Sequence, residues 1–72
     1  MRTVFDKTLV RADHFRSFRV RTTRPAGWEA SEREDQRIIA ERHYSDWHRV
    51  EEAVRCFQQH IADLRAAGWR EA

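Results

Sequence analysis

The chain has 72 residues, which allows one domain, because a single hydrophobic core normally organises about 100 to 150 residues. Hydrophobic residues make up 40% and charged residues 36% of the sequence, a composition that excludes collagen-like, low-complexity and disulfide-scaffold proteins. The net charge of +2 is uneven, since residues 1–27 contain seven basic and two acidic side chains, whereas residues 28–72 contain seven basic and ten acidic ones. We therefore expect one soluble domain, residues 1–72, with a basic first third.

The sequence shows no membrane or secretion signal. A membrane-spanning helix needs about 20 apolar residues, and the longest apolar run here is residues 38–40. No apolar stretch follows the basic N-terminus as it would in a signal peptide. The single cysteine, Cys56, cannot form an internal disulfide. These observations predict a cytoplasmic protein that does not contact membranes.

Two strands are expected in the first third of the chain. In residues 15–24, Phe18, Val20 and Thr22 alternate with serine, arginine and threonine, which predicts a strand with one apolar and one basic face. Residues 2–11 also favour a strand. Their apolar residues fall on both parities, so the inward face of this strand stays open.

A turn at residues 25–27 should join the second strand to a third strand at residues 28–33. Pro25 fixes the backbone at the start of the turn and Gly27 can adopt a left-handed conformation, as in a three-residue hairpin loop. This register pairs Thr22 with Ala30 and Arg24 with Trp28. Trp28 and Ala30 then share the face of Val20.

Residues 37–44 fit either a fourth strand or part of a helix that begins at Ser31. A helix over residues 31–43 would present one apolar spot, Ile38 with Ile39, and no stripe. We therefore favour the strand; if the third hairpin keeps Ile38 inside, Ile39 lies on the open face of the sheet.

The clearest element is a helix over residues 46–67. Its apolar residues are spaced three and four apart and lie on one face: Trp47, Val50, Val54, Phe57, Ile61 and Leu64. Asp46 is a suitable N-cap. Gly68 can end the helix in a left-handed conformation, and Trp69 should then contact Leu64 in a Schellman motif.

Together these elements predict a small α+β domain in which an antiparallel β-meander of three or four strands precedes one long C-terminal α-helix packed on one face. This order, with an aspartate before a helix that ends in Gly68 and Trp69, is loosely similar to the WGR modules of nucleic-acid enzymes. Their Trp-Gly-Arg signature is absent, so no residue role is carried over.

Two groups of side chains could in principle bind a metal ion. Glu52, Cys56, His60 and Asp63 form a stripe on the helix, which we assign to its solvated face because it lies far from the apolar stripe. His43, Asp46 and His48 meet where the last strand joins the helix, and we interpret them as a helix cap with polar neighbours. The sequence has no nucleophile elbow and no phosphate-binding loop. We expect no enzyme, no metal site and no cofactor.

The open face of the sheet is the main candidate for function. Four arginines of the second strand are candidates for binding a polyanion: Arg16, Arg19, Arg21 and Arg24. A core this small stabilises a fold by only about 3 to 5 kcal/mol, and pairing with another chain often adds to that. We therefore expect a non-enzymatic interaction module, with a homodimer through the open sheet or through the helix stripe as options. Nucleic-acid binding through the arginines is the alternative.

Overall fold

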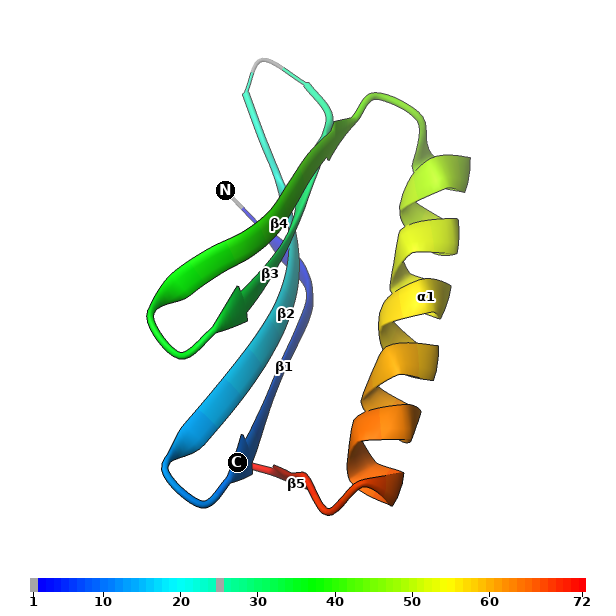
Figure 1. Cartoon of the computed structure of the whole chain (residues 1–72). Helices are drawn as coiled ribbons and strands as arrows, with labels where there is room; N and C mark the ends of the chain where they lie inside the picture. Colours follow the sequence, from blue (N-terminus) through cyan, green and yellow to red (C-terminus); the bar gives the residue numbers. More distant parts are fainter. Residues whose placement is uncertain (1, 25) are drawn as a thin grey trace.

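The computed structural model describes residues 2–24 and 26–72, and in these residues one antiparallel sheet is covered on one face by one helix (Figure 1). The elements are β1 (Thr3–Arg11), β2 (His14–Thr22), β3 (Trp28–Glu34), β4 (Arg37–Tyr44), α1 (Trp47–Ala66) and β5 (Arg70–Glu71). The predicted α+β meander with a C-terminal helix is confirmed, and residues 37–44 form a strand. Over the described residues, α1 is not apolar enough to cross a membrane.

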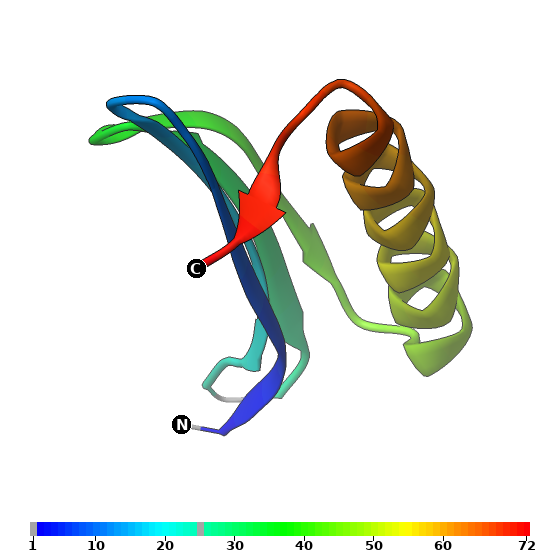
Figure 2. The same cartoon turned by 90° about the horizontal axis from the view of Figure 1, so that it is seen from below.

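The strands lie in the order β4-β3-β2-β1-β5. Four of them form the meander, and β5 returns after α1 to lie beside β1 (Figure 2). In this pair Leu9 faces Glu71 and Val10 faces Arg70. The sequence did not predict β5, because two exposed residues are too few to show an alternating pattern.

The core lies between α1 and the inner face of the sheet. Its buried residues are Leu9, Phe18, Val20, Ala30, Val50 and Ile61. Phe57 packs against both halves of this core, with its ring centroid 5.2 Å from that of Phe18 and 6.3 Å from that of Phe5. Phe5 and Leu9 therefore define the inward face of β1, which the sequence left open.

The ends of α1 are capped as expected. The side chain of Asp46 accepts a hydrogen bond from the backbone N–H of His48 at 3.0 Å, and Gly68 has a φ of 103°. The apolar stripe of the helix packs on the sheet, with Val50 and Ile61 fully or nearly buried. The option that this stripe forms a coiled coil is wrong, because β1, β2 and β3 already cover it.

The register between β2 and β3 differs by two residues from the expectation. Val20 pairs with Ala30 and Thr22 with Trp28, and the N–H of Thr23 donates to the carbonyl of Gly27 at 3.0 Å. The connection is therefore longer than three residues. A shift by two preserves parity, so Trp28 and Ala30 share the inner face with Val20 as predicted. The role assigned to Pro25 lies outside the described residues.

A β-bulge in β4 changes the position of its isoleucines. Glu32 pairs with Ala40 but Arg33 pairs with Ile38, which leaves Ile39 as an extra residue. Ile38 is 50% exposed and Ile39 is 41% exposed. The condition that the hairpin keeps Ile38 inside is not met, because an extra residue reverses which parity faces inward.

Candidate functional site on the open sheet face

The open face, defined as the side of the sheet away from α1, carries Arg19 and Arg21 as expected. Arg19 lies 3.5 Å from a carboxylate oxygen of Asp6. The Nε and Nη2 groups of Arg21 donate to Oε1 of Glu29 at 3.2 and 3.0 Å. Carboxylates of the neighbouring strands thus neutralise both arginines, which reduces their attraction for a polyanion.

Arg16 lies on the other side of the sheet. It shares the parity of Phe18, and its side chain is only 14% exposed. Its Nη2 group pairs with Oε2 of Glu32, a side chain that is 11% exposed, and its guanidinium lies 5.9 Å from the ring centroid of Phe18. Arg16 therefore does not contribute to an open basic face, in contrast to the expectation.

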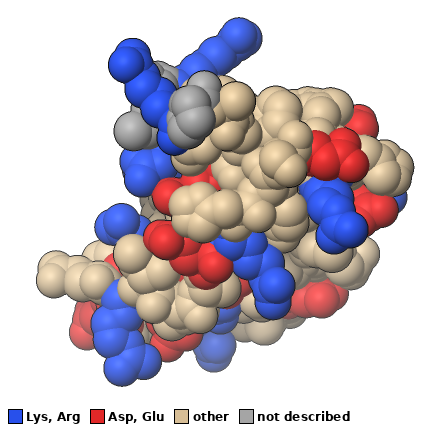
Figure 3. Space-filling model, turned by 90° about the horizontal axis from the view of Figure 1, so that it is seen from above, with Lys and Arg blue, Asp and Glu red and all other residues tan. Residues whose placement is uncertain are grey.

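Arg24 lies in the loop between β2 and β3, where it is exposed. The N–H of Thr22 donates to the carbonyl of Arg2 at 2.8 Å, and the N–H of Arg2 donates to Oγ1 of Thr22, so Arg2 lies at the same end of the sheet. Over residues 2–24 and 26–72, no carboxylate forms an ion pair with either arginine. Figure 3 shows basic side chains gathered at one corner, while basic and acidic side chains are mixed elsewhere.

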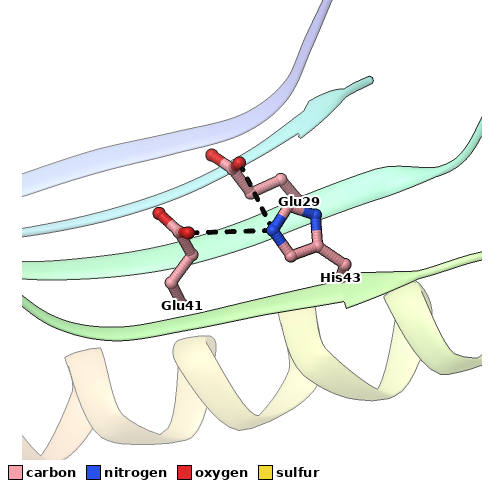
Figure 4. Close-up of side chains that lie close together, drawn as sticks. All are labelled: Glu29, Glu41 and His43. Carbon is pink, nitrogen blue, oxygen red and sulfur yellow. Dashed lines mark ion pairs between the residues drawn. The ribbon is translucent and has the colours of Figure 1, made fainter. Parts of the chain in front are cut away.

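The second feature of the open face is a cluster of Glu29, Glu41 and His43, drawn in Figure 4. Nε2 of His43 lies 3.8 Å from Oε2 of Glu29 and 3.7 Å from Oε1 of Glu41. One ligand atom from each residue lies within 4.8 Å of the other two. The three side chains thus converge on one point above the sheet.

The sheet register explains this convergence. Glu29 pairs with Arg21 on one side and with His43 on the other, so three strands place these residues in one row. Glu41 precedes His43 by two residues and therefore shares its face. The side chain of Glu29 is 13% exposed, whereas that of His43 is 62% exposed. Glu29 is thus largely covered, whereas His43 is open to solvent.

The metal-ligand groups considered from sequence are not brought together. Asp46 caps α1, His48 lies 3.4 Å from Glu52 on the helix, and His43 belongs to the open face of the sheet. The sequence could have linked Glu29 to His43 only with the correct register of β3 and β4.

His60 also differs from expectation. Its ring packs edge-on against Phe18 with centroids 5.4 Å apart, and its Nδ1 lies 3.8 Å from Oε1 of Glu32. It therefore borders the interface between helix and sheet and does not belong to the solvated face, to which the sequence assigned it. Cys56 is exposed, as expected for the polar side of the helix.

Asp35, in the turn between β3 and β4, connects this turn to the start of β2. Its carboxylate accepts a hydrogen bond from the backbone N–H of Phe15 at 3.1 Å and lies 3.2 Å from Nδ1 of His14. The bond from Phe15, followed by that from His14, lowers the pKa of Asp35 below its usual value of 3.8.

No protein family model, curated protein sequence or solved structure matches this chain.

Proposed function

We propose that this chain is a small non-enzymatic interaction module that forms a homodimer through the outer edge of β4. The observation that carries the proposal is that the two edges of the sheet are covered to different extents. At one edge, β5 covers part of β1. At the other edge, within residues 2–24 and 26–72, no strand pairs with the outer side of β4.

An unpaired strand edge presents a row of N–H and C=O groups to which another strand can bind. β4 is eight residues long, and every residue in it except Tyr44 is exposed. Natural edge strands are often protected by being short, by charges or by bulges. β4 carries charges and the bulge at Ile39, but it is eight residues long, and Ile38 and Ile39 are exposed at its centre. These features favour pairing with another strand.

The charges along β4 do not oppose a second copy of the same chain as the partner. In an antiparallel, two-fold symmetric pair centred on Ile39, Arg37 of one copy would lie level with Glu41 of the second copy, and Ile39 would face its own counterpart. The bulge at Ile39 places Arg37 on the inner face and leaves Glu41 on the open face. This register therefore places no like charges opposite each other.

The proposal is tested by measuring mass in solution, by sedimentation or light scattering, over a wide range of protein concentration. We expect a concentration-dependent dimer that Ile39→Lys converts to a monomer, because two lysines would meet at the two-fold axis. The matched control is Val4→Lys, since Val4 on β1 is similarly exposed at 38%. A wild-type protein that stays monomeric at millimolar concentration would contradict the proposal, as would equal loss of dimer in the control.

Polyanion binding is a second candidate, favoured by the exposed Arg24 and Arg2 at one end of the sheet. We expect Arg24→Ala to lower the affinity for a single-stranded oligonucleotide more than Arg19→Ala does, because Asp6 already neutralises Arg19. Each lost phosphate contact should reduce the slope of log affinity against log salt by about 0.7. Equal affinities of wild type and Arg24→Ala would exclude this site.

A further inference from the structure

We propose that Glu29, Glu41 and His43 form a binding site for a divalent first-row metal ion, with Zn²⁺ as the probe. The donor set is mixed, with two carboxylates and one imidazole, and its three ligand atoms lie within 4.8 Å of one another. Three protein ligands that leave a further position to water are a common arrangement for zinc.

Two of the three separations between ligand atoms are close to those around such an ion. Bonds of about 2.0 to 2.2 Å in tetrahedral geometry separate neighbouring ligand atoms by about 3.3 to 3.6 Å. The observed separations of 3.7 and 3.8 Å between Nε2 of His43 and the two carboxylate oxygens exceed this only slightly. Small rotations of the exposed Glu41 and His43 side chains would close the site without backbone movement.

Arg21 orients the carboxylate of Glu29, one of the three proposed ligands. Its Nε and Nη2 groups both donate to Oε1 of Glu29. The other oxygen, Oε2, is left directed toward His43 (Figure 4). Outer hydrogen bonds of this kind orient metal-ligating carboxylates. Two carboxylates and one guanidinium also leave a net negative charge around the site, which favours a dication.

The donor chemistry decides between metals. Mg²⁺ and Ca²⁺ prefer sites made of oxygen ligands alone, whereas an imidazole nitrogen favours zinc and its first-row neighbours. All three donors come from one chain, so the site does not depend on the proposed dimer.

The experiment is calorimetric titration of metal-free protein with Zn²⁺, together with an NMR spectrum of the histidine rings. We expect one ion per chain, a shift of the His43 ring signals and no comparable binding of Ca²⁺. His43→Ala and Glu41→Gln should each weaken binding by at least about tenfold. An amide fingerprint unchanged from that of the wild type would show that both variants remain folded.

Three controls make the test specific. His48→Ala removes an exposed histidine that also lies near one glutamate, and Cys56→Ser removes the exposed thiol. Both should bind Zn²⁺ like the wild type, and so should Ile39→Lys. The inference is overturned if the wild type does not bind, if His43→Ala binds equally well, if Ca²⁺ binds as tightly as Zn²⁺, or if binding is lost with His48 or Cys56.

Discussion

The backbone N–H of Trp69 donates a hydrogen bond to the carbonyl of Leu64 at 3.0 Å, and both side chains pack against the core cluster of Leu9, Phe18 and Ile61. The N–H of Gly68 donates to the carbonyl of Arg65 at 3.1 Å, which completes a Schellman motif. This motif ends α1 and directs the chain back toward the sheet, where β5 pairs with β1. Trp69 is thus an anchor between the helix and the last strand.

We therefore expect Trp69→Ala to lower the free energy of unfolding by about 2 kcal/mol or more, because a partly buried indole leaves the core. Urea unfolding followed by circular dichroism measures the change. The matched control is Trp47→Ala, whose side chain is more exposed and packs mainly on Trp28. An equal or larger loss in the control would contradict the anchoring role of Trp69.

The two glycines should respond differently to replacement by alanine. A Cβ at Gly27 would lie 2.8 Å from the carbonyl oxygen of Tyr44, and the φ there is 124°. A Cβ at Gly68 would meet only the flexible side chain of Arg11, at 3.9 Å, so its cost comes from the φ of 103° alone. We expect a loss of about 1 kcal/mol for Gly68→Ala and more than about 2 kcal/mol for Gly27→Ala. Thermal or urea unfolding that reverses this order would contradict the explanation.

Phe57 should be the most sensitive position on α1. Its ring contacts both halves of the core, so Phe57→Ala would leave a cavity between helix and sheet. We expect a loss of about 3 kcal/mol or more, which is most of the stability of a domain this small. The neighbouring exposed Gln58, changed to alanine, serves as control. A midpoint of unfolding unchanged in Phe57→Ala would be incompatible with this packing.

The ion pair of Arg16 with Glu32 should matter for stability, in contrast to that of Arg19 with Asp6. Arg16→Ala would leave the nearly buried carboxylate of Glu32 without its main partner, with an expected loss of about 3 kcal/mol. Arg19→Ala breaks an exposed pair and should cost less than about 1 kcal/mol. The double variant Arg16→Ala with Glu32→Gln should recover part of the loss. Urea unfolding of all three variants measures these changes in unfolding free energy. A loss in Arg19→Ala as large as that in Arg16→Ala would contradict the explanation.

The lowered pKa of Asp35 should make the stability of the fold depend on pH. Its pKa is lowered in the folded state, so its stabilising effect is complete above the usual value of 3.8 and is lost as the pH falls through the lower folded value. Asp35→Asn keeps a residue that tolerates the φ of 57° but removes the charge. The difference in unfolding free energy between wild type and variant should be largest at neutral pH and shrink in acid. A difference independent of pH would show that the carboxylate is not involved.

The helix and the general fold could be predicted because their signals are local. The spacing from Trp47 to Leu64 and the residues at both helix ends determine α1 without knowledge of the rest of the chain. The parity of β2 and β3 was also predictable, since it depends only on the alternation of side chains.

The sheet register was not predictable in detail, and the candidate sites depend on it. The bulge at Ile39 has no sequence signal such as a glycine, yet it reverses the two faces of β4. Without that register, His43 could not be placed beside Glu29, and the parity that puts Arg16 inside does not reveal its partner Glu32. Contacts between side chains on neighbouring strands cannot be predicted from the alternation of residues within one strand.

The two-residue strand β5 bears on how the proposed dimer could grow. With β1 covered at Leu9 and Val10, and with the N–H of Ala72 bonded to the carbonyl of Thr8, β4 is the edge with more exposed backbone. In the proposed dimer, the two copies would join through β4 and leave β1 at both ends of the joined sheet. Removal of residues 70–72 would expose more of β1, and we expect further copies to add there. Residues 70–72 would thus limit the joined sheet to two copies.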